Sequence, residues 1–98
     1  MTRPCKPRTI CCRPGSYYYK PAGIPLFELE ESVLNLAEVE ALRLADSMGL
    51  YQDAAARKMG ISRQTFGNTI KAARRKVADA IIKGKALRIE QPKRKEQK

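Results

Sequence analysis

Apolar residues between positions 62 and 83 recur at steps of three and four, the period of an α-helix that buries one side. The predicted buried stripe consists of Phe66, Ile70, Ala73, Val77 and Ile81. The opposite stripe is polar and then basic, and consists of Gln64, Asn68, Lys71 and Arg75, with Arg63, Gly67 and Arg74 beside it. The pattern predicts a long amphipathic helix over about 62–83, ended by Gly84.

A shorter helix is predicted directly before it, over residues 52–59. Gly60 follows, where the chain leaves this helix with a positive φ that glycine adopts at little cost. Ser62 then supplies a hydroxyl as N-cap of the long helix. The small and apolar positions expected to pack this corner are Ala55, Ala56, Met59 and Ile61. Two helices joined by a tight glycine turn are typical of a DNA-binding helix-turn-helix unit.

A third helix is predicted to begin at Asn35, with Glu38 completing a capping box, and to end at Gly49. Its apolar arc holds Ala41, Leu42, Leu44, Ala45 and Met48. Its polar arc holds Glu40, Arg43, Asp46 and Ser47. We expect it to pack across the other two, which makes a tri-helical core.

The remaining segments carry weaker patterns. Residues 1–25 are rich in proline and basic residues, which excludes a long helix. Residues 10–12 and 17–19 are either short strands around a turn at Pro14 and Gly15, or part of a flexible basic arm. Residues 26–34 have no clean period, and their conformation stays open. Near the C-terminus, Ala86, Leu87 and Ile89 suggest a short strand or docking segment, and residues 91–98 a solvated tail.

We therefore predict a mainly α fold, with an irregular or short-stranded N-terminal arm and a short C-terminal strand or tail. The predicted divisions are a basic, Pro- and Cys-rich arm over 1–34, a helix-turn-helix core over 35–84, and a strand with a basic tail over 85–98. A chain of 98 residues is sufficient for one modest core.

Charge favours nucleic acid as the partner. The chain has 20 Lys and Arg against 10 Asp and Glu, and residues 57–98 alone carry fourteen positive and three negative side chains. Clustered basic residues neutralise phosphates and release condensed counterions. The basic segment lacks the exposed aromatic and leucine face that would hold it in a membrane interface. With neither an apolar run near 20 residues nor a signal peptide, we expect a cytoplasmic protein with reduced thiols.

The long helix supplies the candidate DNA contacts. The residues expected to contact base edges are Arg63, Gln64, Thr65 and Asn68. Those expected to contact phosphate are Ser62, Lys71, Arg74 and Arg75. Gly67 lacks a side chain, so we expect the helix backbone to approach the groove closely there. A single unit of this size covers limited DNA, which favours a homodimer on a pseudo-palindromic site. A merely solvated polar face is the simpler alternative.

Other chemistry is less well supported. Cys5, Cys11 and Cys12 have a spacing that suits no common zinc motif, and the chain has no histidine to complete one. We expect reduced thiols there, with a metal or thiol-switch role as the alternative. Residues 17–19 are three tyrosines that either pack on the helices or stack on single-stranded bases. Without histidine or a glycine-rich phosphate loop, we expect neither enzymatic activity nor a cofactor.

Five motifs carry a resemblance that covers residues 3–90. They are KPAGIPL at 20–26, EALRLAD at 40–46, GLYQ at 49–52, GISRQTFG at 60–67 and GKALRI at 84–89. In this order they resemble domain of unknown function 134, a family of small proteins described as predicted DNA-binding proteins. The resemblance implies a helix-turn-helix related to the fourth region of bacterial sigma factors. It also implies that residues 62–65 belong to the recognition-helix signature.

The sequence thus favours a transcriptional regulator that binds double-stranded DNA in a sequence-specific manner. One alternative is an RNA-binding protein that uses the same basic surface. Another is a metal- or redox-responsive adaptor whose arm acts on a protein partner such as RNA polymerase. Members of the resembled family often carry cysteines in this arm, which is the reason to retain the adaptor hypothesis.

Overall fold

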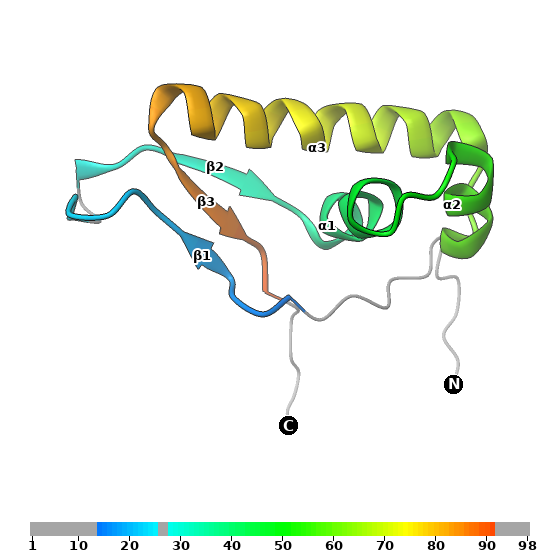
Figure 1. The fold of residues 1–98 in the computed structure, drawn as a ribbon, viewed down its shortest axis with the longest axis horizontal. Helices are drawn as coiled ribbons and strands as arrows, with labels where there is room; N and C mark the ends of the chain where they lie inside the picture. The colour runs from blue at the N-terminus through cyan, green and yellow to red at the C-terminus, as the bar shows by residue number, and fades with distance from the viewer. Residues whose placement is uncertain (1–13, 26–27, 92–98) are drawn as a thin grey trace.

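The computed structural model describes residues 14–25 and 28–91, which form helices and a small sheet (Figure 1). The helical elements are α1 (Leu36–Leu42), the π-helical turn η2 (Arg43–Ser47), α2 (Gln52–Met59) and α3 (Arg63–Lys83). The strands are β1 (Tyr18–Tyr19), β2 (Glu31–Leu34) and β3 (Ala86–Ile89). The described part is mostly helical, as predicted, and its three-stranded sheet makes the architecture mixed α/β.

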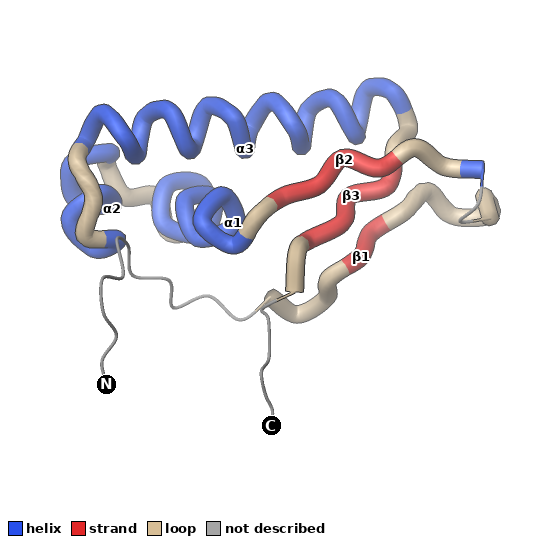
Figure 2. The backbone as a smooth tube through the Cα atoms, turned by 180° about the vertical axis from the view of Figure 1, so that it is seen from behind, coloured by secondary structure: helices blue, strands red, loops and turns tan. Residues whose placement is uncertain are grey.

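Helix α3 runs along one long side of the molecule and contacts both of its halves (Figures 1 and 2). Its N-terminal half packs on α1 and α2, and its C-terminal half covers the sheet. A helix of its 21 residues is about 30 Å long. The predicted helix over 62–83 is therefore confirmed, and it is the element that joins the two parts.

The predicted helix ends are also confirmed. Asn35 Oδ1 accepts from the Glu38 backbone N–H at 2.8 Å, and the Asn35 N–H donates to Glu38 Oε1 at 3.0 Å, which is a complete capping box. Gly60 ends α2 with φ 71° and Gly84 ends α3 with φ 69°. A side chain with a β-carbon is strained at such angles, so glycine favours both stops.

Two apolar clusters form the core. The larger lies where α1, η2, α2 and α3 meet, and its buried members are Ala37, Ala41, Leu44, Ala55, Ala56, Met59, Phe66 and Ile70. Four of these eight are alanines on α1 and α2, which lets the helix axes come close. The smaller lies between the sheet and α3, with Leu34, Ala73 and Ile89 buried and Tyr17, Val77 and Leu87 half-buried against them.

The sheet has the strand order β1-β3-β2 (Figure 2). β3 is parallel to β2, with Leu34 opposite Ile89, and antiparallel to β1, with Tyr18 opposite Arg88. On one face Glu31 connects all three strands, because it accepts from the Tyr18 hydroxyl at 3.0 Å and from Arg88 Nε at 2.8 Å. These hydrogen bonds lower the pKa of Glu31.

The sheet brings together segments from both ends of the sequence. β1 and β2 come from the predicted arm, and β3 from the predicted C-terminal strand. Of the two strands considered near Pro14 and Gly15, the second exists as Tyr18–Tyr19, and residues 10–12 lie outside the described residues. Most of the predicted tail over 91–98 lies outside them too.

Three predicted positions are wrong. Ile81 is 70% exposed, because after Val77 the buried stripe advances by three residues to Ala80 rather than by four. Met48 is 51% exposed, because the chain winds into a π-turn in which the Met48 N–H bonds to the Arg43 carbonyl, and this shifts the helical phase. Glu40 is only 2% exposed, and Arg43 Nε and Nη2 donate to its carboxylate at 2.9 Å each.

Across the described residues, no helix combines the length and apolarity required to cross a membrane.

Candidate nucleic-acid interface

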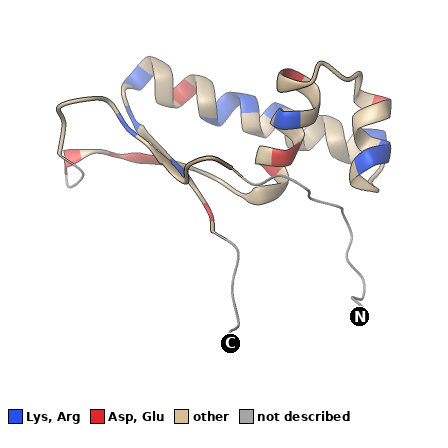
Figure 3. Ribbon diagram, turned by 60° about the horizontal axis from the view of Figure 1, so that its bottom comes forward, with Lys and Arg blue, Asp and Glu red and all other residues tan. Residues whose placement is uncertain are grey.

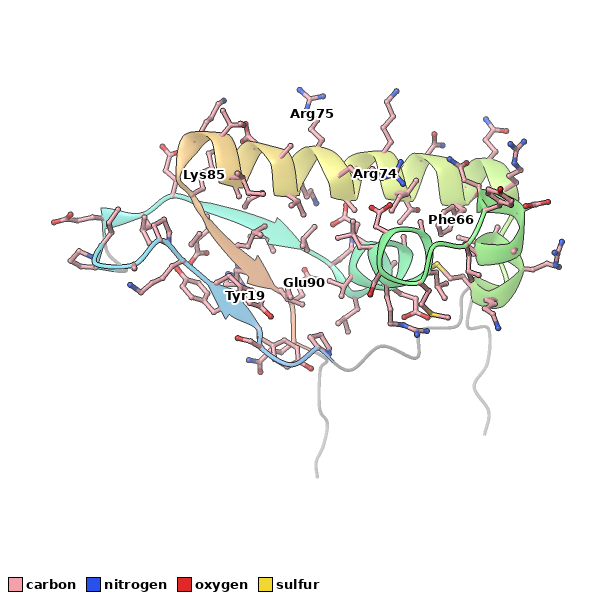
Figure 4. All side chains as sticks on the ribbon, viewed as in Figure 1. Tyr19, Phe66, Arg74, Arg75, Lys85 and Glu90 are labelled. Atoms are coloured by element: carbon pink, nitrogen blue, oxygen red, sulfur yellow. The ribbon has the colours of Figure 1, made fainter. Side chains whose placement is uncertain are left out.

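The outer face of α3 is the exposed stripe that lies opposite the buried one. Phe66, Ile70 and Ala73 are buried as predicted, which fixes the rotation of the helix. The exposed stripe contains Gln64, Asn68, Lys71 and Arg75, and Arg63 is exposed beside it in the first turn. The structure therefore brings five of the eight candidate DNA-contact residues onto one open surface. Figure 4 shows Arg75 projecting away from the rest of the molecule.

The first turn of α3 is organised by two hydroxyls. Ser62 Oγ accepts from the Thr65 backbone N–H at 3.0 Å and donates to Thr65 Oγ1 at 2.9 Å. Ser62 is thus the N-cap, as predicted. Thr65 is half-buried, so its hydroxyl faces the cap more than solvent. Ser62 and Thr65 hold the start of the helix in place, whereas Arg63 and Gln64 between them are exposed.

The cations of α3 fall into two groups. Within the described part of the chain, no carboxylate lies within ion-pair distance of Arg63, Lys71 or Arg75. Lys76, by contrast, donates to both carboxylate oxygens of Glu38 on α1, at 2.8 and 3.0 Å. The first group lies on the outer side of α3 and keeps its charge available to a partner. Figure 3 shows Lys and Arg spread along α3 and acidic residues at the start of β2.

Arg74 has a partner within the protein. Its Nη2 and Nε donate to the two carboxylate oxygens of Asp46 in η2, at 2.7 and 3.1 Å. These hydrogen bonds lower the pKa of Asp46 and raise the pKa of Arg74, and desolvation opposes each shift to a smaller degree. Both side chains are about half exposed, so the pair contributes less than about 1 kcal/mol to stability. A phosphate contact by Arg74 would have to compete with Asp46.

Gln52 borders the same surface, although the sequence patterns did not single it out. It is the first residue of α2, and its Oε1 lies 3.3 Å from the position that a β-carbon on residue 67 would occupy. Gly67 therefore makes room for a side chain from α2. The GLYQ motif of the resemblance ends at Gln52, but only the packing of α2 on α3 shows what this side chain touches.

Comparison with known proteins gives the family. The sequence profile described as "Protein of unknown function DUF134" matches residues 1–96. The chain belongs to the DUF134 family. It is 60% identical over 90 residues to a UPF0251 protein of Dehalococcoides mccartyi, which covers 92% of this chain and 77% of that protein.

Two other relatives agree. A UPF0251 protein of Vibrio vulnificus is 54% identical over 89 residues, which covers 91% of this chain and 89% of the relative. One from Moorella thermoacetica is 51% identical over 90 residues and 92% of this chain, but only 60% of its own length. No solved structure matches.

The cysteine and tyrosine hypotheses have different outcomes in this DUF134 protein. Cys5, Cys11 and Cys12 lie outside the described residues, and within those described no three Cys, Asp or Glu side chains come together as a metal site. Tyr17 packs against the smaller apolar cluster, and Tyr18 bonds to Glu31. Tyr19 is exposed. Packing therefore accounts for Tyr17 and a hydrogen bond for Tyr18, and base stacking stays a prediction.

Proposed function

We propose that this DUF134 protein binds double-stranded DNA in a sequence-specific manner, with α3 in the major groove, and regulates transcription. The observation that carries the proposal is the exposed stripe of α3, where Gln64 and Asn68 are followed by Lys71 and Arg75. A major groove about 12 Å wide admits an α-helix. The tight turn before α3 suits a helix-turn-helix of the sigma-factor type, as the resemblance implies.

The order of residues along this stripe matches the order of contacts on a duplex. Amide side chains near the helix start can pair with adenine edges, and Arg63 can pair with guanine. Lys71 and Arg75 lie two to three turns beyond Gln64 and one to two turns beyond Asn68, where phosphates border the groove. The charge of both termini also favours binding to DNA. Residues 1–13 carry four positive and no negative side chains, and residues 92–98 carry four positive and one negative.

We further propose that the protein acts as a homodimer. One α3 contacts only a few base pairs, and paired half-sites one helical turn apart are the usual way for such units to gain specificity.

Selection of duplexes from a random DNA pool at physiological salt, followed by sequencing, tests this function. We expect enrichment of two half-sites related by a pseudo-two-fold axis. Retention without enrichment would show non-specific binding, and preference for structured RNA at the same salt would favour the RNA-binding alternative. A single enriched half-site would retain specific DNA binding and reject the dimer.

A further inference from the structure

Gln52 lies among residues that the proposed function places on DNA. On a helix surface, residues three and four positions apart are neighbours. The exposed neighbours of Gly67 on α3 are therefore Arg63 and Gln64 on one side and Lys71 on the other, since Ile70 is buried. Because Gln52 Oε1 packs at Gly67, its amide meets α3 at the position that these three residues flank, while coming from a different helix.

The amide of Gln52 is also available to a partner. The residue is exposed, and none of the described residues makes a hydrogen bond to its side chain. Glycine inside a long helix is less favourable than alanine, so Gly67 lowers the intrinsic stability of α3. Alanine there would have to displace Gln52 by a few tenths of an ångström, and Gln52 Oε1 is the one described atom within 4 Å of that position apart from the adjoining residues and the local backbone of α3.

We propose that Gln52 donates a hydrogen bond from its side-chain amide to a phosphate oxygen of the duplex that α3 contacts, and that Gly67 positions it to do so. This inference rests on the proposed DNA binding and adds a residue of α2 to that surface. Phosphate is the expected acceptor because the helix before a recognition helix crosses the sugar–phosphate backbone. Contacts to phosphate set the register of a protein on DNA.

Removal of a neutral amide and removal of a cation change the salt dependence of DNA binding differently. Removal of a lysine or arginine that contacts phosphate lowers both affinity and salt dependence, because fewer counterions are released. Removal of a neutral hydrogen-bond donor lowers affinity alone. We therefore expect Gln52→Ala to weaken binding about tenfold, with the slope of log affinity against log salt unchanged.

The first experiment compares wild-type protein, Gln52→Ala and Gln91→Ala on the selected duplex and on a scrambled duplex of the same composition. Gln91 is also exposed but follows β3, so it is a matched glutamine away from the interface. We expect Gln52→Ala to weaken binding to both duplexes about equally, and Gln91→Ala to have no effect. Unchanged affinity in Gln52→Ala would overturn the inference, and a loss confined to the selected duplex would overturn the phosphate assignment.

The second experiment is a double-mutant cycle with Gly67→Ala. If Gly67 acts through Gln52, Gly67→Ala weakens binding in the wild-type background but not further in Gln52→Ala. An equal additional loss in both backgrounds would show that Gly67 is needed for close approach to DNA, and would overturn its proposed role. If the wild-type protein binds no duplex, the proposed function itself fails. That outcome differs from a failure of the Gln52 inference alone, in which the wild-type protein binds DNA and Gln52→Ala binds it equally well.

Discussion

The two halves of α3 differ in what they expose, although they belong to one unbroken helix. The N-terminal half covers a helical core and presents Gln64, Asn68 and Lys71 to solvent, and Arg75 follows just past the midpoint of the helix. The C-terminal half covers the sheet, and the same stripe continues into Ala78 and Ile82, the latter 80% exposed. The polar and basic part of the stripe therefore ends at Arg75, and beyond Arg75 the stripe is apolar.

Ion pairing separates the cations of α3 by the side of the helix on which they lie. In the C-terminal half, Asp79 accepts from Lys83 at 3.2 Å and from Lys85 at 2.8 Å, and both contacts lower its pKa. On the outer side of α3, Lys71 and Arg75 have no such partner among the described residues, whereas Arg74 and Lys76 on either side of Arg75 are paired with Asp46 and Glu38. The difference teaches that total charge is a poor guide to an interface. Cations left without an internal partner identify the surface better.

The largest expected effect is on stability. Phe66→Ala removes a fully buried ring from the larger cluster and should cost about 3–5 kcal/mol. Ile82→Ala, in the exposed C-terminal part of α3, should change stability by no more than about 0.5 kcal/mol. Urea unfolding followed by circular dichroism measures both. Equal losses would mean that the two halves of α3 are buried alike in solution.

Gln64→Ala should reduce sequence discrimination by about 1–3 kcal/mol at one base pair of each half-site. Duplex selection repeated with the variant would show this as a lost preference at that position. If Gln64→Ala and Arg63→Ala both leave the selected motif unchanged, α3 is oriented differently on DNA from the way proposed.

Arg75→Ala should weaken binding to all duplexes and reduce the salt slope by about 0.9. Lys83→Ala is the matched control, because it removes the same charge from the half of α3 where the lysine is paired with Asp79. Binding titrations at several salt concentrations distinguish the two variants. The same reduction in slope for both would mean that overall charge, rather than position on α3, determines binding.

The smallest effect is expected for Asp46→Asn, which removes the charged partner of Arg74. The loss of stability should stay below about 1 kcal/mol, since the pair is half exposed. The pKa of Asp46 in the folded protein lies below its ordinary 3.8, so the pair stabilises fully above that pH and is lost as pH falls through the folded value. Thermal unfolding of both proteins should thus converge below pH 3.8.

The same substitution has a second expected result, since Arg74 becomes available to phosphate. Affinity for DNA at neutral pH should rise slightly, while Tm falls slightly. A fall in affinity would show that Asp46 is needed to hold Arg74 in place for its contact.

Local patterns predicted the helices well. The apolar period, the capping box at Asn35 and the glycines at 60 and 84 each depend on residues near one another in sequence. The sheet was harder to predict, because β2 has four residues and its partner β3 lies 55 positions further on, with Leu34 opposite Ile89. The burial of Glu40 depends on two hydrogen bonds from Arg43, and a wheel that assigns charged residues to the outside misses them.

The candidate interface shows the same limit. The outer stripe of α3 follows from its period, but whether a cation on it is free depends on tertiary partners such as Asp46. Gln52 reaches α3 only because two helices cross at Gly67. Contacts of this kind have no signature in a single helix.

The parallel pairing of β2 with β3 has a consequence for how the chain folds. α1, η2, α2 and α3 all lie in the connection between these two strands, and their mutual contacts join residues closer in sequence than the strand pairs, such as Asp46 and Arg74, which are 28 positions apart. The β2–β3 ladder must close a loop of more than fifty residues, which is entropically costly and slow compared with helix formation. The three helices are therefore expected to assemble first. β3 then pairs with β1 and β2, after the three helices have packed together. Release of β3 from the sheet would leave intact the helices that carry the candidate interface.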